Sequence, residues 1–451
     1  MTVLLYVLGV LFVAFGVGLS IGLHEIGHLV PAKKFGVKVT QYMVGFGPTL
    51  WSTRRGETEY GIKAIPLGGY IRMIGMFPPR PGDAEGTIRV SSTGRLSQLA
   101  DEARQLSLEE IEPGDEDRVF YKLSVPKKVV IMMGGPVMNL VIAVVLLTGL
   151  VTLYGQQEVK DGAVVASVSE CVVQASQAAT KTTCAPSDPK TPAFLAGIQP
   201  GDKIVSVAGQ PIKRTVDVGK LIRPRVGEQV PIVVVRDGAE QTLQVTPIRN
   251  TVQQVGPDGT PLVNADGEPV VMDAGFVGVS SAPVTALERQ SVAVVPGILG
   301  EQVQHIAGVL LHIPQRMTDV AQAAFGSEAR DPNGPVSVVG VGRMAGEISS
   351  GSIDGLDTAA KFATLVSLLA GLNVALFVFN LIPLLPLDGG HVAGALWEGL
   401  KRNAARLLKR PDPGHVDVAK ALPVAYAVSS VLIVMSLLLM YADVVKPVKL
   451  G

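Results

Sequence analysis

VLLYVLGVLFVAFGVGLSIGLHEIGHLV occupies residues 3–30 and is long and apolar enough to cross a membrane, because the hydrocarbon core takes about 20 apolar residues of a helix. Comparable stretches follow at 129–154, 362–386 and 422–442. The chain is 47% hydrophobic and only 17% charged, which is too apolar for an average soluble enzyme. No basic residue precedes the first stretch and no small-residue cleavage site follows it, so we expect a retained span rather than a signal peptide.

Basic residues around these stretches predict their orientation, because lysine and arginine concentrate in cytoplasmic loops. They follow the first stretch, precede the second and follow the third: Lys33, Lys34, Lys38, Lys122, Lys127, Lys128, Lys401, Arg402, Arg406, Lys409 and Arg410. We expect transmembrane segments at 1–31, 127–155, 361–390 and 422–445. Segments 32–126 and 391–421 would be cytoplasmic, whereas both termini and 156–360 would face outward.

The charge balance argues against one class of partner. The formal net charge is zero and no long run of basic residues occurs, so we expect no nucleic-acid partner.

The first span ends in His24-Glu25-Ile26-Gly27-His28. Histidines at i and i+4 lie one helical turn apart on one face, so both imidazoles can reach one zinc ion while Glu25 lies beside its water. Zinc lowers the pKa of that water towards 7, and a carboxylate can then take its proton during attack on a peptide carbonyl. Lys33 follows about 7 Å further along the helix, which predicts a site just inside the cytoplasmic face.

A catalytic zinc usually takes three protein ligands and leaves one position open. The third predicted span ends in NLIPLLPLDGGH at 380–391, an apolar run broken by two prolines and closed by Asp388. The first and third spans both end on the cytoplasmic side, so Asp388 lies at the depth of the histidine pair and is the expected third ligand. His391 could instead be a ligand or an outer partner. Prolines at this depth predict an unwound segment packed in protein or lining a wet cavity.

Glycines punctuate short alternating strands over 39–76, which predicts a small sheet. A protease that cuts a transmembrane helix must first unwind it, and an exposed sheet edge can hold the unwound strand by backbone hydrogen bonds. The alternative is an ordinary cytoplasmic hairpin. Residues 80–118 are polar and poor in aromatic residues, so we expect a flexible insertion there.

The outward segment divides into 156–285 and 286–360. The run PAFLAGIQPGDKIVSVAG at 192–209 resembles bacterial PDZ domains, with further strands expected at 163–168, 203–207, 230–236, 241–247 and 275–279 and a helix near 215–223. Such a domain can bind a peptide at a sheet edge, or it can simply exclude substrates with bulky outer domains. Residues 298–325 form an amphipathic stretch that would lie on the membrane or act as a lid.

The two cysteines, Cys171 and Cys184, both fall on the outward side, where oxidising conditions allow disulfides. A local disulfide and two free thiols both remain open, because sequence alone does not show whether their Cα atoms approach.

Together these motifs resemble the site-2 protease family, in particular its bacterial branch typified by the regulator of sigma-E protease and its actinobacterial relatives. The resemblance rests on HEIGH at 24–28, GFGP at 45–48, PLGGY at 66–70, GGPVMN at 134–139 and the stretch at 380–391. It implies an intramembrane zinc protease of the bacterial inner membrane that cuts single-span proteins, typically anti-sigma factors already cleaved by another protease.

The resemblance also implies roles for individual residues. It assigns one Zn²⁺ to His24, His28 and Asp388, and general base and acid catalysis to Glu25. It makes 39–76 a membrane-reentrant β-loop and implies substrate contacts at Asn380, Gly45, Phe46, Gly47, Pro48, Gly68 and Gly69. Asn139 is a weaker site candidate than Asn380. The proline spacing NxxPxxPxDG departs from the enterobacterial NxxPxPxxDG, which affects only the expected path of the local loop. A second departure is the single PDZ-like module, where that branch carries two.

The expected fold is a polytopic α-helical membrane protein with four transmembrane helices, a membrane-associated β-hairpin region and one extracytoplasmic PDZ-like α+β domain. The main alternative is a non-proteolytic membrane scaffold with a structural zinc. A structural site normally has four protein ligands, whereas the sequence offers three. A metal transporter would need polar residues along a path, whereas here they cluster at one depth.

Overall fold

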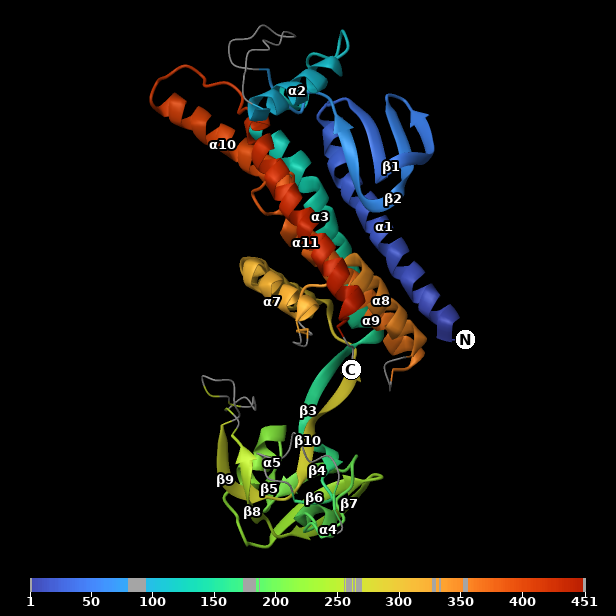
Figure 1. Ribbon diagram of the computed structural model, residues 1–451, viewed down its shortest axis with the longest axis vertical. Coiled ribbons are helices and arrows are strands. Elements are labelled where there is room, and N and C mark those ends of the chain that lie inside the picture. Colours follow the sequence, from blue (N-terminus) through green and yellow to red (C-terminus); the bar gives the residue numbers. More distant parts are fainter. Residues whose placement is uncertain are drawn as a thin grey trace. The chain divides into compact units, whose positions relative to one another are not determined.

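A computed structural model of the chain describes residues 2–79, 95–172, 184–185, 187–254, 256, 262, 264, 270–326, 330–331, 334–351 and 356–448. The chain forms two compact units. One consists of Met1–Tyr154 with Gln290–Gly451 and the other of Gly155–Arg289, and we call them the helical unit and the sheet unit. The long apolar helices all belong to the helical unit, so the predicted membrane part and the predicted outer domain fall into separate units (Figure 1).

Five helices of the helical unit are long and apolar enough to cross a membrane. Four match the predicted spans: α1 (Thr2–Lys34), α3 (Val125–Gly149) continued by η2 (Leu150–Tyr154), α9 (Thr358–Asn380) and α11 (Leu422–Val445). The fifth is α6 (Val295–Leu311), the least apolar of them, which packs beside α3 and α9 through Val303 and Ile306. The predicted number of four spans is therefore one fewer than the candidate helices in the described part of the chain.

Glycines let α1 and α3 approach closely. A Cβ atom on Gly27 would overlap the backbone of Gly134, and a Cβ on Gly134 would overlap that of Gly27. Backbones in such contact are typical of packed membrane helices, where small residues replace bulky ones at the crossing. Further along, Val13 of α1 is buried against Ala345 of α8 (Val338–Ser350) and Leu365 of α9. These contacts fix α1 between α3, α8 and α9.

One end of the helical unit gathers the elements around the predicted site. There, α2 (Arg95–Glu109), α10 (Asp388–Leu407) and a two-stranded sheet lie at the same end, whereas the first residues of α1 and the last of α11 lie at the opposite end (Figure 1). The sheet pairs β1 (Val39–Arg55) with β2 (Thr58–Met73) in antiparallel fashion, within the region expected to form a small sheet. Gly45 and Gly47 have φ of 96° and 82°, and the register shifts around them, as expected where glycines allow bulges.

Two segments expected to be cytoplasmic, one of them also expected to be flexible, contain helices. Residues 80–94 of the expected flexible insertion lie outside the described residues, but α2 follows. Its Arg104 is buried and forms ion pairs at 2.6 Å with Asp101 and Asp417. The expected cytoplasmic segment 391–421 contains most of α10, followed by η5 (Val418–Ala421). The polar composition that suggested flexibility serves buried ion pairs between these segments, and such pairs cannot be read from local sequence.

The segment 286–360 begins with η4 (Val292–Val294) and α6 and continues with α7 (Ile313–Phe325) and α8. The predicted amphipathic stretch 298–325 is thus two helices that meet at His312. Val320 of α7 packs on Ala442 of α11. Asp443 is buried nearby, where it pairs with Arg330 and accepts a hydrogen bond of 2.6 Å from the Ser337 amide. This ion pair anchors the end of α11.

The sheet unit is built on a six-stranded antiparallel sheet. Its order is β10-β3-β4-β6-β7, with β5 beside β4. The strands are β3 (Gln156–Val168), β4 (Lys203–Val207), β5 (Gln210–Pro211), β6 (Val230–Arg236), β7 (Ala239–Val245) and β10 (Val279–Glu288). A separate pair joins β8 (Ile248–Gln253) to β9 (Val271–Phe276), and the helices are α4 (Pro192–Leu195) and α5 (Thr215–Ile222).

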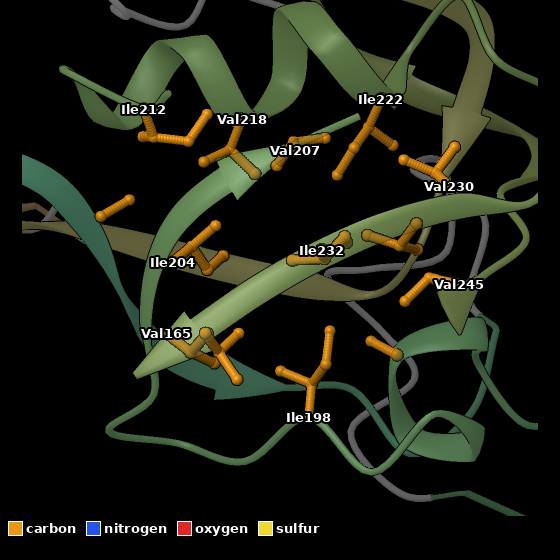
Figure 2. Packing of buried hydrophobic residues seen from close by; sticks show 14 residues of the cluster. Val165, Ile198, Ile204, Val207, Ile212, Val218, Ile222, Val230, Ile232 and Val245 are labelled. Atoms are coloured by element: carbon orange, nitrogen blue, oxygen red, sulfur yellow. The ribbon is translucent and has the colours of Figure 1, made fainter. Parts of the chain in front are cut away.

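Apolar alternation along these strands builds the core of the sheet unit. Ile204 and Val207 of β4 and Ile232 of β6 face Val218 and Ile222 of α5, and all are buried (Figure 2). The predicted strands 203–207 and 230–236 coincide with β4 and β6, 163–168 lies within β3, and 241–247 is displaced by two residues from β7. The predicted strand 275–279 instead spans the end of β9 and the start of β10. The period-two patterns therefore predicted where most strands lie, but they predicted the first and last residues of the strands less accurately.

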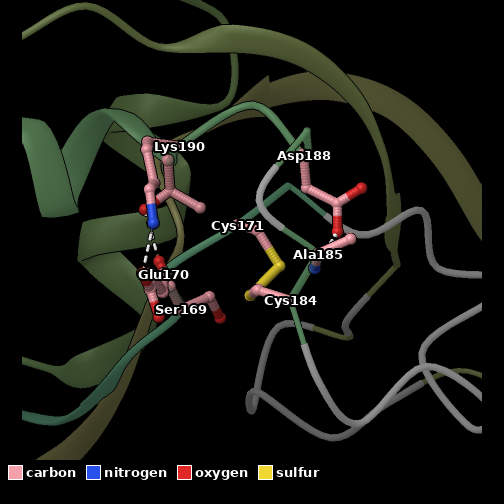
Figure 3. Close-up of a disulfide and its surroundings, with 8 residues drawn as sticks. Ser169, Glu170, Cys171, Cys184, Ala185, Asp188 and Lys190 are labelled. Atoms are coloured by element: carbon pink, nitrogen blue, oxygen red, sulfur yellow. Dashed lines mark hydrogen bonds and ion pairs between the residues drawn. A yellow bond between two sulfur atoms is a disulfide. The ribbon is translucent and has the colours of Figure 1, made fainter.

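Cys171 and Cys184 form a disulfide with Cα atoms 5.9 Å apart (Figure 3). Cys171 also pairs with Lys190 in a β-bridge, and the Lys190 ammonium contacts the Glu170 carboxylate. The sequence left open a disulfide or two free thiols, and the structure has the disulfide. It joins two residues of the sheet unit that are 13 positions apart in sequence.

Candidate metal centre

His24, His28 and Asp388 bring three potential ligand atoms together. The histidines lie one turn apart near the end of α1, and Asp388 is the first residue of α10. The two Nε2 atoms are 3.3 Å apart, and each lies 3.4 Å from Oδ2 of Asp388. Among the described residues this is the one group of three or more metal-binding side chains. The sequence prediction thus named the three residues that the fold places together.

The geometry of this triangle fits zinc. Ligand atoms at about 2.0–2.1 Å from a tetrahedral zinc lie about 3.3–3.4 Å from one another. Oδ2 of Asp388 is also buried and, within the described structure, has no hydrogen-bond partner, which is an unfavourable state for a carboxylate unless a cation completes it. Three protein ligands leave the fourth position of a tetrahedral ion open, as in catalytic rather than structural sites.

The turn between α9 and α10 places Asp388. α9 ends at Asn380, and residues 381–387 are not helical before α10 begins, as the two prolines predicted. A Cβ on Gly389 would overlap the Ile382 carbonyl, and one on Gly390 would lie 2.5 Å from the Leu385 nitrogen. The glycines after Asp388 are therefore needed for the turn to fold back on α10.

Glu25 lies between the metal centre and the sheet. It is 8% exposed, and the backbone of Ile71 in β2 forms a hydrogen bond with its carboxylate. A Cβ on Gly69, two residues earlier, would lie 2.9 Å from Cγ of Glu25. Strand β2 can therefore run beside Glu25 only because this position lacks a side chain.

The other predicted substrate-contact residues occupy the same sheet. Gly69 pairs with Val44, next to Gly45, and Gly68 has φ of 120° with its Cα facing the ring of Phe46. Phe46 stacks on Tyr70 at 6.2 Å and is 43% exposed. Gly47 and Pro48 follow on the exposed part of β1. Asn380 is partly exposed at the end of α9, eight residues before Asp388.

Helix α3 contacts both imidazoles, and of its contacting residues the sequence analysis named only Asn139 as a site candidate. A Cβ on Gly135 would overlap Nε2 of His28 and approach the ring of His24, so this glycine lies directly against both imidazoles. Nδ1 of His28 is 2.8 Å from the carbonyl oxygen of Ile131, and Nδ1 of His24 is 3.1 Å from the side-chain amide of Asn139. A backbone carbonyl leaves no sequence signal, whereas the GGPVMN motif did point to this region.

A second polar cluster lies further along α10. Glu398 is 2% exposed and accepts hydrogen bonds from Lys128 of α3 at 2.9 and 3.0 Å and from the Val416 amide at 3.1 Å. Burial by itself raises the pKa of Glu398, but hydrogen bonds from His415, Lys128 and Val416 lower it to about 2. His391 lines a small cavity together with Lys128 and Glu398 and, among the described residues, is not one of the three that converge in the ligand triangle.

Comparison with known proteins agrees with this geometry. The family model of peptidase family M50 matches residues 12–409. The zinc metalloprotease Rip1 of Mycobacterium tuberculosis is 33% identical over 453 residues, covering 99% of this chain and all of that protein. Rip1 of Mycolicibacterium smegmatis is also 33% identical, with the same coverage. The metalloprotease MmpA of Caulobacter vibrioides is 25% identical over 87% of each chain. The chain therefore belongs to peptidase family M50, the site-2 proteases, and is an intramembrane zinc metalloprotease of the inner membrane.

Proposed function

We propose that His24, His28 and Asp388 hold the zinc ion, that Glu25 is the general base, and that the enzyme hydrolyses a peptide bond within the transmembrane segment of single-span proteins. The observation that carries this proposal is the triangle of ligand atoms 3.3–3.4 Å apart at the end of an apolar helix, with Glu25 next to the first ligand. Ionisable residues at such a place in a membrane helix usually serve function, because burying them there is unfavourable.

The chemistry divides between the metal and the chain. When bound, zinc supplies Lewis acidity and makes water a good nucleophile near neutral pH. Glu25 takes the proton from the attacking water and then delivers it to the nitrogen of the leaving peptide. This role is supported by the burial of Glu25 and by the hydrogen bond between its carboxylate and the Ile71 backbone of β2, the strand that would present substrate.

We propose that the β1–β2 sheet receives the unwound substrate as an added strand. Its exposed surface carries Phe46, Leu50, Trp51, Ile62 and Ile65, each at least 43% exposed, which suits contact with lipid or with an apolar substrate segment. Backbone pairing at a sheet edge holds many sequences equally well. Because Gly69 of β2 contacts Glu25, a substrate strand added beside β2 would lie close to the base. Asn380, at the end of α9, would bind the substrate backbone.

We further propose that both chain ends and the sheet unit are extracytoplasmic and that the metal centre lies near the cytoplasmic face. The arrangement of the helical unit supports this, since the end of α1 with Lys33 and Lys34 and the helix α10 with its basic residues lie at the same end. Substrates would be membrane proteins already shortened outside by another protease, and anti-sigma factors are the class suggested by the family resemblance.

The sheet unit has a cleft of about 460 Å³ between α5 and residues 275–281, beside strand β10. Within the described residues, β10 pairs only with β3, so its other edge is open to an added strand. We favour a PDZ-like unit that binds an extended peptide there. If the unit only excludes bulky substrates, filling the cleft by Gly219→Trp would leave cleavage of a short substrate unchanged.

The deciding experiment compares wild type with Glu25→Gln in cleavage of a model single-span protein in detergent, with zinc content measured for both. We expect Glu25→Gln to retain zinc and to lose cleavage. If both cleave equally, Glu25 is not the base. If wild type binds zinc and cleaves no single-span substrate, the scaffold with a structural zinc replaces the protease as the proposed activity.

A further inference from the structure

Asn139 is a buried asparagine in which only one of the two polar groups of the side-chain amide has a hydrogen-bond partner among the described residues. It lies on α3 and is 1% exposed. Its Nδ2 is 3.1 Å from Nδ1 of His24, whereas its Oδ1 is buried and has no hydrogen-bond partner among the described residues. An unpaired buried amide oxygen is unfavourable, so this arrangement requires an explanation.

The imidazole of His24 indicates which end of the amide should face it. Nε2 of His24 points to the triangle with His28 and Asp388, where it would bind zinc as the unprotonated nitrogen of a neutral ring. The proton of that ring is then on Nδ1, which must donate a hydrogen bond. An amide nitrogen cannot accept it, but an amide oxygen can.

Rotating the Asn139 amide by half a turn brings Oδ1 to Nδ1 of His24. The two ends of an amide have nearly the same shape, and hydrogen bonding decides between them. The rotated amide accepts the Nδ1–H of His24 and leaves Nδ2, instead of Oδ1, as the group without a partner in the described structure.

The other histidine ligand shows the same pattern on the same helix. Nδ1 of His28 donates to the carbonyl oxygen of Ile131 at 2.8 Å. Gly135 lies against both rings. Ile131, Gly135 and Asn139 are four residues apart, so they form one row along α3. Ile131 and Asn139 thus contact the Nδ1 atoms, away from the triangle, and Gly135 between them lies against the Nε2 side of both rings.

We propose that Asn139 is a positioning residue whose Oδ1 accepts the Nδ1–H of His24, fixing the tautomer and ring orientation that direct Nε2 to the zinc. The inference rests on the proposed ligand role of His24. Outer partners of metal-bound histidines act in this way and typically change metal affinity about 10–100-fold when removed.

Asn373 offers a matched control. It is also 1% exposed in a membrane helix, α9, and its Oδ1 is also without a partner among the described residues. Its Nδ2 donates to Oγ of Ser20 at 3.0 Å, one turn before His24 on α1. It therefore joins α1 to another helix, as Asn139 does, without contacting a ligand.

The test measures zinc affinity of the full-length protein in detergent by competition with a chelator, for wild type, Asn139→Leu, Asn139→Asp and Asn373→Leu. We expect Asn139→Leu to bind zinc about 10–100-fold more weakly. Asn139→Asp, which keeps an acceptor and has no donor, should stay within a few-fold of wild type, and Asn373→Leu should be unchanged. Thermal unfolding and size-exclusion profiles confirm that each variant is folded.

Three outcomes would overturn the inference. Unchanged affinity in Asn139→Leu would show that Asn139 does not orient a ligand, and equal losses in Asn139→Leu and Asn139→Asp would show that the amide nitrogen matters instead. Equal losses in Asn139→Leu and Asn373→Leu would indicate helix packing alone. The protease proposal fails separately, if wild type binds no zinc or if Glu25→Gln still cleaves, so the two failures are distinguishable.

Discussion

Helix α10 carries two carboxylates, the partly buried Asp388 and the buried Glu398, that differ in how they are satisfied. Asp388, at its start, faces two imidazole nitrogens, and its buried Oδ2 lacks a hydrogen-bond partner in the described structure. Glu398, ten residues later, accepts hydrogen bonds from Lys128 and from the Val416 amide. In the first cluster, two imidazole nitrogens and a carboxylate oxygen point to one place, and a cation is needed there. The second cluster already contains a cation, the Lys128 ammonium. An incomplete buried cluster therefore indicates a metal site, and a complete one indicates a structural contact.

The largest effect should come from breaking the incomplete cluster. Asp388→Asn removes the negative ligand, and we expect zinc binding to fall by more than the about 100-fold typical of outer partners, with loss of cleavage. Folding should be little affected, because a buried unpaired charge is removed. Metal analysis and thermal unfolding of the apo-protein check both expectations. Retention of zinc by Asp388→Asn would rule out its role as a ligand and favour His391.

Breaking the complete cluster should instead destabilise the protein. Lys128→Met removes the buried cation of Glu398, which keeps only the partly exposed Arg402 at 3.2 Å, and we expect a loss of about 1–3 kcal/mol in the free energy of unfolding. The double variant Lys128→Met/Glu398→Leu should recover most of it, because neither charge remains. Denaturant titration in detergent measures this. An equally unstable double variant would contradict the view that the unpaired charge causes the loss.

Lowering the pH should weaken the stabilisation that Glu398 gives to the folded protein. The pKa of Glu398 is lowered from 4.5 to about 2 in the folded protein, so its contribution to stability is fully present above pH 4.5 and is lost as pH falls towards 2. The lowering corresponds to about 3 kcal/mol. We expect the stability difference between wild type and Glu398→Gln to shrink over that range. A difference that is constant from pH 6 to pH 2.5 would contradict the lowered pKa.

The smallest effects are expected from replacing one glycine at each cluster by alanine. Gly135→Ala would place a methyl group against both imidazoles, and a ligand displaced by about 1 Å can reduce activity about 100-fold. Gly399→Ala, next to Glu398, would bring its Cβ to 3.3 Å from a Val125 methyl group and should change stability by less than about 1 kcal/mol. Cleavage rates and unfolding midpoints of both variants test the contrast. Similar cleavage by both would show that the imidazoles tolerate displacement.

The sequence predicted most of what depends on local periodicity. Apolar stretches located α1, α3, α9 and α11, because each membrane helix satisfies its own backbone and needs only length and apolar side chains. The spacing of His24 and His28 fixed their common face, and orientation by basic residues placed Asp388 at their depth. Alternation located β4 and β6. Each of these signals is a property of a short stretch of chain.

The predictions were wrong or incomplete where distant residues decide the structure. Helix α2 lies in a segment that was expected to be flexible from its polar composition. The ion pair of Arg104 with Asp417 joins residues 313 positions apart, so the local sequence does not reveal it. The carbonyl of Ile131 carries no side-chain signal, and the close contact of Gly135 with both imidazoles depends on how α1 crosses α3.

Sequence alone therefore determined which side chains can hold the metal, because ligand chemistry and helical period are local properties. Only the tertiary structure decided how those ligands are oriented. That orientation depends on hydrogen bonds and close packing between helices more than 100 residues apart in the chain, as between His28 and Ile131 or between His24 and Asn139.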